Sequence, residues 1–151
     1  MDPHDLPELN LHATTIAYPA GPDAPPAGLL IVGRAGSGKS SLALQLLGLG
    51  AQLVADDRTV LRLDAGGIMA RAPEALRGLI EARHIGILNA TALAEAPICA
   101  IIDMDHAETH RMPPQRNYEM MGISLPCLYR SDNPAWPAAV LHYLKAGKAD
   151  V

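Results

Sequence analysis

The sequence predicts an α/β domain built around a mixed β-sheet. Two apolar runs of strand length, residues 28–32 and 98–104, lack the polar alternation of a strand that has one face in water. The first run leads directly into a glycine-rich segment and then into leucines at helical spacing, Leu42, Leu46 and Leu49. A buried strand, a loop and a helix in this order are typical of an α/β fold.

The remaining elements follow from composition and turn residues, in chain order. Strand-like runs, bounded by Pro, Gly and Asp, cover residues 11–18, 52–63, 67–70, 84–90 and 122–129. Residues 64–67 (Asp-Ala-Gly-Gly) predict a hairpin turn, and residues 106–120 predict a polar loop. We expect helices at residues 40–49, 73–79 and 136–145, the last of them with its inward face formed by Ala138, Val140, Leu141 and Leu144.

Length and charge limit the classes of function. The 151 residues, 49% of them hydrophobic, suit a single domain with a real core. A net charge of -4 provides no basic surplus for binding nucleic acid, so no nucleic-acid partner is expected. The acidic N-terminus does not resemble a secretory signal, and no apolar run approaches a membrane span of roughly 20 residues. We therefore expect a cytoplasmic protein without a membrane partner.

Cysteine spacing predicts neither a disulfide framework nor a zinc site. Cys99 and Cys127 lie in apolar surroundings, with no Cys-x-x-Cys or Cys/His pattern near them. We expect both to be free and buried, since unpaired cysteine behaves as a small apolar residue.

A complete phosphate-binding motif occupies residues 33–40, which fit G-x-x-x-x-G-K-[ST] between a buried strand and a helix start. Backbone N–H groups of such a loop bind phosphate oxygens, assisted by the helix dipole. Lys39 would neutralise the β- and γ-phosphates of ATP, and Ser40 would offer its hydroxyl to Mg²⁺. The predicted nucleotide site consists of Gly33, Arg34, Ala35, Gly36, Ser37, Gly38, Lys39, Ser40 and Ser41.

Two adjacent carboxylates, Asp56 and Asp57, follow the apolar run that comes after the helix. The end of a strand at this place would face the phosphates and supply a metal ligand or a general base. Because neighbouring side chains of a strand point to opposite faces, we expect only one of the two to enter the site. The sequence leaves open which one.

With these pieces in order, the chain resembles the catalytic domain of HPr kinase/phosphorylase, which phosphorylates a serine of the phosphocarrier protein HPr. The resemblance lies in LHAT (11–14), in GRAGSGKSSLALQLLGLGAQLVADD (33–57) and in RAPEALRGLIEARHIGILNA (71–90). It implies a phosphoenolpyruvate-carboxykinase-like mixed sheet, an ATP- and Mg²⁺-dependent serine kinase, a role in phosphotransferase-linked carbon metabolism, and a homo-oligomer, expected to be a hexamer.

The resemblance also implies roles for single residues. His12 is expected in the active site, and one of Asp56 and Asp57 is the expected proton acceptor from the substrate serine. Ser40, Asp57 and Glu81 are the expected Mg²⁺ ligands. An arginine on a mobile loop is expected near the transferred phosphate; we assign it to Arg111, with Arg116 as the other candidate.

The chain departs from this family at both ends. We expect one catalytic domain over residues 1–151, with residues 1–10 as a tail. The family's Pro-Gly-Arg-Asn element, tied to dephosphorylation, is replaced by LYRSDNPAW (128–136), where Arg130 and Asn133 are the candidates to substitute. Phosphorylase activity is therefore expected to be weaker than kinase activity. The alternatives are a small-molecule kinase with the same loop and a non-catalytic nucleotide-binding regulator, which an assay of phosphoryl transfer would distinguish.

Overall fold

The computed structural model describes residues 7–151. Within them lie one nine-stranded sheet, one two-stranded hairpin and two α-helices. The strands of the large sheet are β1 (Glu8–Leu11), β2 (Thr14–Tyr18), β3 (Ala27–Val32), β4 (Gln52–Ala55), β5 (Thr59–Asp64), β6 (Gly67–Arg71), β9 (Ala96–Ala107), β10 (Asn117–Met120) and β11 (Ile123–Arg130). The hairpin consists of β7 (Leu79–Ala82) and β8 (Gly86–Asn89), and the helices are α1 (Lys39–Gly48) and α2 (Trp136–Ala146).

The sheet is mixed, as the sequence predicts. Its order is β1-β5-β6-β9-β3-β2-β4, with β11 beside β9 and β10 beside β11. β3 and β11 both run parallel to β9, whereas β2 is antiparallel to its two neighbours β3 and β4. The first residues of β9 pair with β6 and the later ones with β3, so this long strand belongs to both halves of the sheet.

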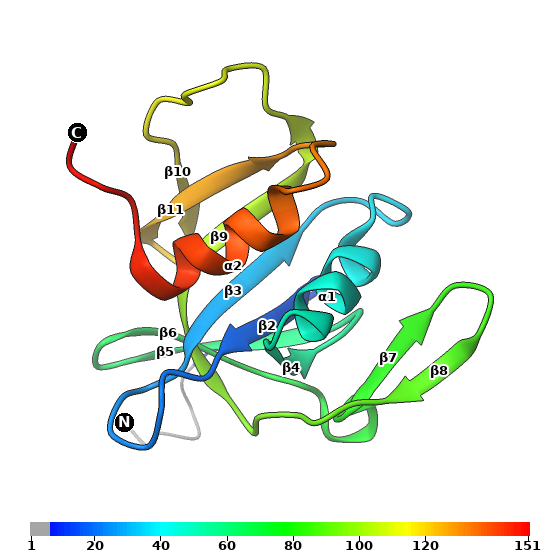
Figure 1. Ribbon diagram of the computed structural model, residues 1–151. Helices are drawn as coiled ribbons and strands as arrows, with labels where there is room; N and C mark the ends of the chain where they lie inside the picture. The colour runs from blue at the N-terminus through cyan, green and yellow to red at the C-terminus, as the bar shows by residue number, and fades with distance from the viewer. Residues whose placement is uncertain (1–6) are drawn as a thin grey trace.

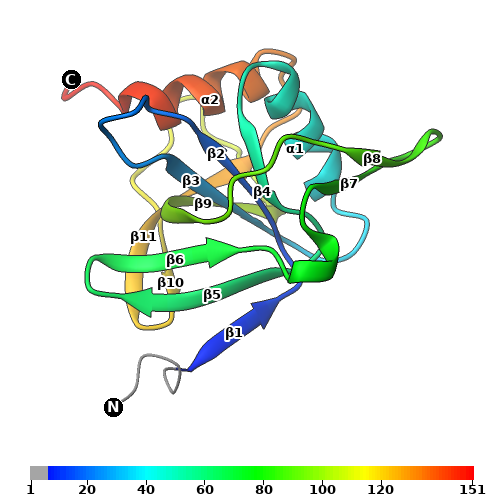
Figure 2. The same cartoon turned by 90° about the horizontal axis from the view of Figure 1, so that it is seen from below.

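Both helices cover one face of the central strands, and β5, β6 and β10 lie on the other face (Figures 1 and 2). Each face has its own apolar core. Leu29 and Ile31 of β3 pack with the helices, and Leu30 and Val32 pack toward β5 and β6. This two-sided burial explains why residues 28–32 carry no polar alternation. No helix of residues 7–151 is both long enough and apolar enough to span a membrane.

Several predicted elements are confirmed. β3 covers residues 28–32, α1 matches the expected helix to within one residue at each end, and residues 64–67 make the hairpin turn between β5 and β6. The run expected as one strand at 11–18 is interrupted at residues 12 and 13, which separate β1 from β2. β1 begins inside the segment expected as a tail, whose residues 1–6 lie outside the described part of the chain.

Other predicted elements are wrong. Residues 73–79 contain only a 3₁₀ turn at Glu74–Leu76, and the following residues form β7, so Glu81 lies on a strand. Gly78, with φ of 76°, turns the chain there, and pairing with β8 overrides the local helix preference. The expected loop at 106–120 is shorter, because His106 and Ala107 extend β9 and residues 117–120 form β10.

Two smaller expectations are also corrected. Ala138 is exposed, so the buried side of α2 rests on Val140 and Leu141, with Leu144 partly buried against them. Both cysteines are free, but only Cys127 is buried. Cys99 is exposed because the register between β3 and β9 shifts there: Gly28 pairs with Ile98 and Leu29 with Ala100.

Candidate active site

The phosphate-binding loop, residues 33–40, connects the end of β3 to the start of α1. Gly33, Gly36 and Gly38 have positive φ angles of 151°, 80° and 100°. At Gly33 a Cβ atom would lie 2.7 Å from Ser37 Oγ and 3.0 Å from Met104 Cβ, so only glycine fits. The helix begins without a side-chain cap and without an acidic residue in its first turn. Its free N–H groups therefore remain available to an anion.

Lys39 lies inside the loop and is buried. Its Nζ donates hydrogen bonds to the carbonyl oxygens of Gly33, at 2.7 Å, and of Arg34, at 2.9 Å. Burial lowers the pKa of Lys39, and the carboxylates of Asp105, Asp57 and Asp56 oppose this effect. The ammonium group is thus held where a phosphate oxygen could replace the carbonyls as its partner.

Ser37 carries a buried hydroxyl oxygen that has no hydrogen-bond partner within the described residues. An unpaired buried hydroxyl is costly, roughly 1–3 kcal/mol. The hydroxyl belongs to the loop that the motif assigns to phosphate, so a phosphate oxygen is a fitting partner. The loop therefore fits the nucleotide that its sequence predicts.

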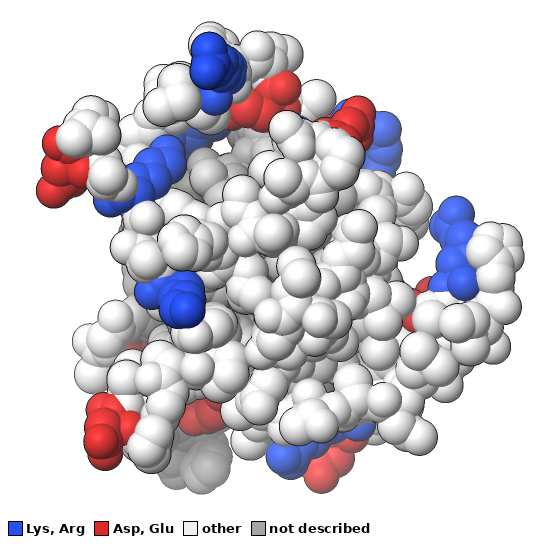
Figure 3. All heavy atoms as spheres, viewed as in Figure 1, with Lys and Arg blue, Asp and Glu red and all other residues white. Residues whose placement is uncertain are grey.

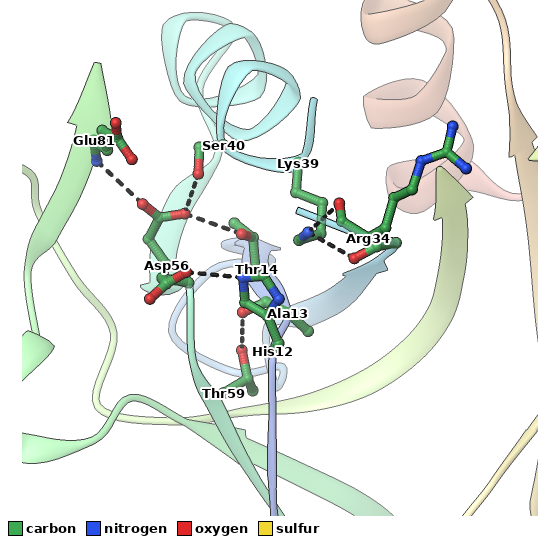
Figure 4. A network of polar contacts seen from close by, with 11 residues as sticks. His12, Ala13, Thr14, Arg34, Lys39, Ser40, Asp56, Thr59 and Glu81 are labelled. Carbon is green, nitrogen blue, oxygen red and sulfur yellow. Dashed lines mark hydrogen bonds and ion pairs between the residues drawn. The ribbon is translucent and has the colours of Figure 1, made fainter. Parts of the chain in front are cut away.

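Asp56 is the centre of the polar network shown in Figure 4. Its buried carboxylate accepts hydrogen bonds from Ser40 Oγ at 2.6 Å and Thr14 Oγ1 at 3.0 Å, both on Oδ1. The backbone N–H of Glu81 donates to Oδ2 at 3.1 Å. The network joins α1, β2 and β7 at one carboxylate that faces the serine expected to bind Mg²⁺.

Asp57 has a different partner from Asp56 and lies, like it, in the bend that follows β4. It adopts φ of 67°, in the left-handed region that Asp tolerates better than most residues. Its Oδ1 lies 2.9 Å from Nε2 of His12, and both side chains are partly open to solvent. His12 reaches this position because the strand structure is interrupted between β1 and β2 at that residue.

A cleft of about 200 Å³, here named the small cleft, lies between the loop and this pair. The structure brings together in its wall most of the residues that the sequence and the resemblance select: His12, Lys39, Ser40, Ser41, Asp57 and Glu81. Arg83 also lines the small cleft and is missed by sequence reasoning. Its signal is its place two residues after Glu81.

Oxygen donors suited to Mg²⁺ gather at this place. The Ser40 hydroxyl contacts the buried Asp56 carboxylate, and both Ser40 and Glu81 line the small cleft. Within residues 7–151 no group of three acidic, His or Cys side chains is close enough to hold a metal by itself. Mg²⁺ ordinarily uses one or two carboxylates together with substrate phosphates and water, so the residues present fit this ion.

The arginine assignments fare differently. Arg111 is on the exposed loop between β9 and β10 and lines neither of the clefts beside the phosphate-binding loop. Arg116 is engaged elsewhere: it donates to both oxygens of Glu108, at 3.1 and 3.0 Å, and lies over the ring of Tyr129. The structure thus does not bring Arg111 or Arg116 to the phosphate site.

Asp105 is a further residue that sequence reasoning misses. Its Oδ1 accepts a hydrogen bond from the backbone N–H of Arg34 at 3.0 Å. β9 runs parallel to β3, so Asp105 emerges beside the start of the phosphate-binding loop and holds it in place.

The chain is similar in sequence to known proteins of one family. Residues 23–103 match the family model of the HPr serine kinase C-terminal domain. The HPr kinase/phosphorylase of Geobacillus sp. (strain WCH70) is 34% identical over 124 residues, which cover 77% of this chain and 38% of that protein. That of Clostridium perfringens (strain 13 / Type A) is 37% identical over 87 residues, or 58% of this chain and 26% of that protein.

A solved structure shares the fold. The structure of the HPr(Ser) kinase/phosphatase from Coxiella burnetii superposes with a TM-score of 0.74 at 22% identity, covering 91% of this chain and 88% of the other. The predicted α/β fold with its mixed sheet is thereby confirmed. The chain spans about two fifths of the length of the curated relatives, 38% in the Geobacillus protein. With its family model matched over more than half of its residues, the chain belongs to the HPr serine kinase C-terminal domain family.

Proposed function

We propose that this domain is an ATP- and Mg²⁺-dependent serine kinase and that HPr is its phosphate acceptor. The observation that carries the proposal is the small cleft, where Lys39 and Ser40 of the phosphate-binding loop face the Asp57–His12 pair. A phosphate donor and a hydroxyl acceptor need these two sets of groups on opposite sides of one cavity.

Asp57 is the proposed proton acceptor. Its carboxylate is open to solvent, and among residues 7–151 its one side-chain hydrogen bond is with His12. It is therefore free to take the proton of an incoming serine hydroxyl, a role that requires hydrogen-bond reach before any matched pKa. His12 would hold the carboxylate in position through Nε2. Lys39 would hold the transferred phosphate and neutralise its charge.

Asp56 rather than Asp57 is our proposed carboxylate on the metal side. The resemblance favours Asp57 for this role, but Asp56 is the carboxylate in contact with Ser40. When bound, Mg²⁺ would neutralise charge on the β- and γ-phosphates; Ser40, Asp56 and Glu81 are the residues placed to hold it. The buried hydrogen bonds of Asp56 fix its orientation before the ion arrives.

The proposed activity also implies a metabolic role and a cellular location. A kinase that acts on HPr with ATP would regulate phosphotransferase-linked carbon metabolism in the cytoplasm. We further propose a homo-oligomer, with a hexamer as the expected size, which light scattering on the purified protein measures directly.

The test is incubation of the purified protein with ATP, Mg²⁺ and HPr, followed by intact-mass measurement of HPr. We expect the mass of one phosphoryl group on HPr and none on HPr whose acceptor serine is replaced by alanine. Lys39→Ala should show no transfer, because the phosphates lose their counter-charge. Addition of inorganic phosphate to phosphorylated HPr in the same assay measures the reverse activity, which we expect to be slower.

Two results would contradict the proposal. Nucleotide binding without any transfer to HPr would leave a regulator that senses ATP through the loop. Transfer to a metabolite in place of HPr would make the domain a small-molecule kinase.

A further inference from the structure

A second and larger cleft lies on the other side of the phosphate-binding loop. Its volume is about 470 Å³, and we name it the large cleft. One wall is the loop itself with the start of α1, and the opposite wall is residues 130–137, which connect β11 to α2. Figure 1 shows these two connections side by side at the same end of the sheet. The roles proposed above leave this cleft unused.

The two clefts share part of the loop as a wall. Gly36, Gly38 and Ser41 line both of them. Lys39, Ser40 and Asp57 line only the small cleft. The terminal phosphate of a polyphosphate chain, which would be transferred, must therefore lie in the small cleft. The other end of the same chain must then pass over the shared residues into the large cleft.

The strand order also supports a ligand that extends from the small cleft into the large cleft. β2, whose first residue Thr14 lines the small cleft, and β4, which is followed by Asp57, lie on one side of β3, whereas β9 and β11 lie on the other side. Ligands of open α/β sheets bind at the carboxyl ends of the strands, across such a division. Volume also separates the two clefts, because sites for whole organic ligands usually measure about 300–1,000 Å³. Only the large cleft reaches this range.

The lining of the large cleft suits a nucleoside joined to phosphates. Trp136, half-buried at the start of α2, lines the cleft together with Pro137. Arg34 and Arg130 line the same cleft. Arg130 donates a 3.0 Å hydrogen bond from Nε to the Met104 carbonyl oxygen, and its Nη1 lies 4.0 Å from the exposed carboxylate of Asp132, which also lines the cleft. In Figure 4 the Arg34 side chain extends away from the Asp56 network. An aromatic surface for a base beside cations for phosphate is a recurring combination.

We propose that the large cleft binds the nucleoside end of the phosphate donor, with Trp136 packed against the base and Arg34 and Arg130 beside the phosphate nearest the ribose. This rests on the proposed function only for the statement that the loop binds a nucleotide. The transferred phosphate and the protein substrate then share the small cleft, and the nucleoside never occupies the path by which the acceptor serine enters.

Trp136 is the only tryptophan in the sequence, so its fluorescence reports on this cleft. Mg²⁺-ADP should change its emission, whereas Mg²⁺-pyrophosphate, which lacks a nucleoside, should bind in calorimetry and leave the emission nearly unchanged. Trp136→Ala should weaken ADP binding about tenfold, as loss of one base–aromatic contact does. Its pyrophosphate affinity should stay within about twofold of the wild type, and Trp136→Phe should recover most of the ADP affinity.

His142→Ala is the matched control, because this exposed residue lies on the same helix and does not line the large cleft. Equal losses of ADP and pyrophosphate affinity in Trp136→Ala would overturn the inference, since the residue would then act through the loop. Unchanged ADP affinity would overturn it as well. If Trp136→Ala does not fold, the wild type provides the test. An equal response of its tryptophan emission to ADP and to pyrophosphate would also overturn the inference. Failure of both ligands to bind the wild type would instead refute the proposed nucleotide site.

Discussion

The pair of aspartates allows two isosteric substitutions with unequal consequences for stability. In Asp56→Asn the amide oxygen keeps two acceptor positions for Ser40 and Thr14, but the amide nitrogen is a donor and faces the backbone N–H of Glu81. One partly buried N–H is then left without an acceptor, which costs about 1–3 kcal/mol. The two remaining bonds also lose their charge. We expect a total loss of about 2–3 kcal/mol in the free energy of unfolding.

Asp57→Asn is the control. Asp57 is exposed and contacts the half-exposed His12, a type of pair that contributes about 0–1 kcal/mol. Asn also tolerates the left-handed backbone at this position, so the turn is not strained further. We therefore expect a change below about 1 kcal/mol. Both variants should lose phosphoryl transfer, Asp57→Asn by about 10²–10⁴-fold as for loss of a general base.

Urea unfolding followed by circular dichroism measures the two stabilities, and the HPr mass assay measures transfer. A titration of Mg²⁺ in that assay should show a raised requirement in Asp56→Asn alone. Equal destabilisation by the two substitutions, or a greater loss for Asp57→Asn, would refute the description of Asp56 as the buried centre of the network.

The remaining predictions concern the phosphate-binding loop and the cysteines. Gly33→Ala should lose about 1–3 kcal/mol of stability and bind ADP more weakly, because its Cβ would meet Ser37 and Met104; Gly66→Ala, with nothing within 4 Å of the added Cβ, should change neither quantity. Burial raises the pKa of the Cys127 thiol to about 11. Iodoacetamide at pH 8 should therefore modify only Cys99 in the folded protein, as peptide mass mapping would show, and unfolding should expose Cys127. Rapid modification of Cys127 in the folded state would contradict its burial.

Local features of the sequence predict the loop and its helix well. The motif at 33–40 and the leucines of α1 depend on neighbours a few residues apart, so their structure follows from the sequence alone. Strand alternation predicts that only one of Asp56 and Asp57 enters the site, whereas both lie there: Asp56 contacts Ser40 and Asp57 lines the small cleft, because the two residues follow β4 in a bend. Which of them turns inward depends on Thr14, 42 residues earlier, and on Glu81, 25 residues later. No local pattern contains that information.

The errors have other causes. Residues 73–79 are expected as a helix, but the segment ends in β7, whose pairing with β8 in a short hairpin overrides the local preference. Arg111 was assigned by resemblance of a loop, and loops vary most among related folds. The residues that do line the clefts, Arg83, Arg34 and Arg130, are positioned by the hairpin, by the phosphate-binding loop and by β11.

Surface charge adds little to the identification of the site. The helix-bearing face in Figure 3 is largely uncharged, with Lys and Arg side chains standing apart from one another. On this face the candidate site is therefore marked by its cavities and hydrogen bonds and not by a charged patch.

The long strand β9 gives the domain a common structural element at its centre. Ala96, Ile98 and Ile101 pack in one core, and Ala100 and Ile102 pack in the other. Both cores depend on this strand. Neither core can therefore unfold independently of the other. A cooperative, all-or-none transition follows from such sharing. Loosening of the β5–β6 layer would be transmitted along β9 to Asp105 and the start of the phosphate-binding loop.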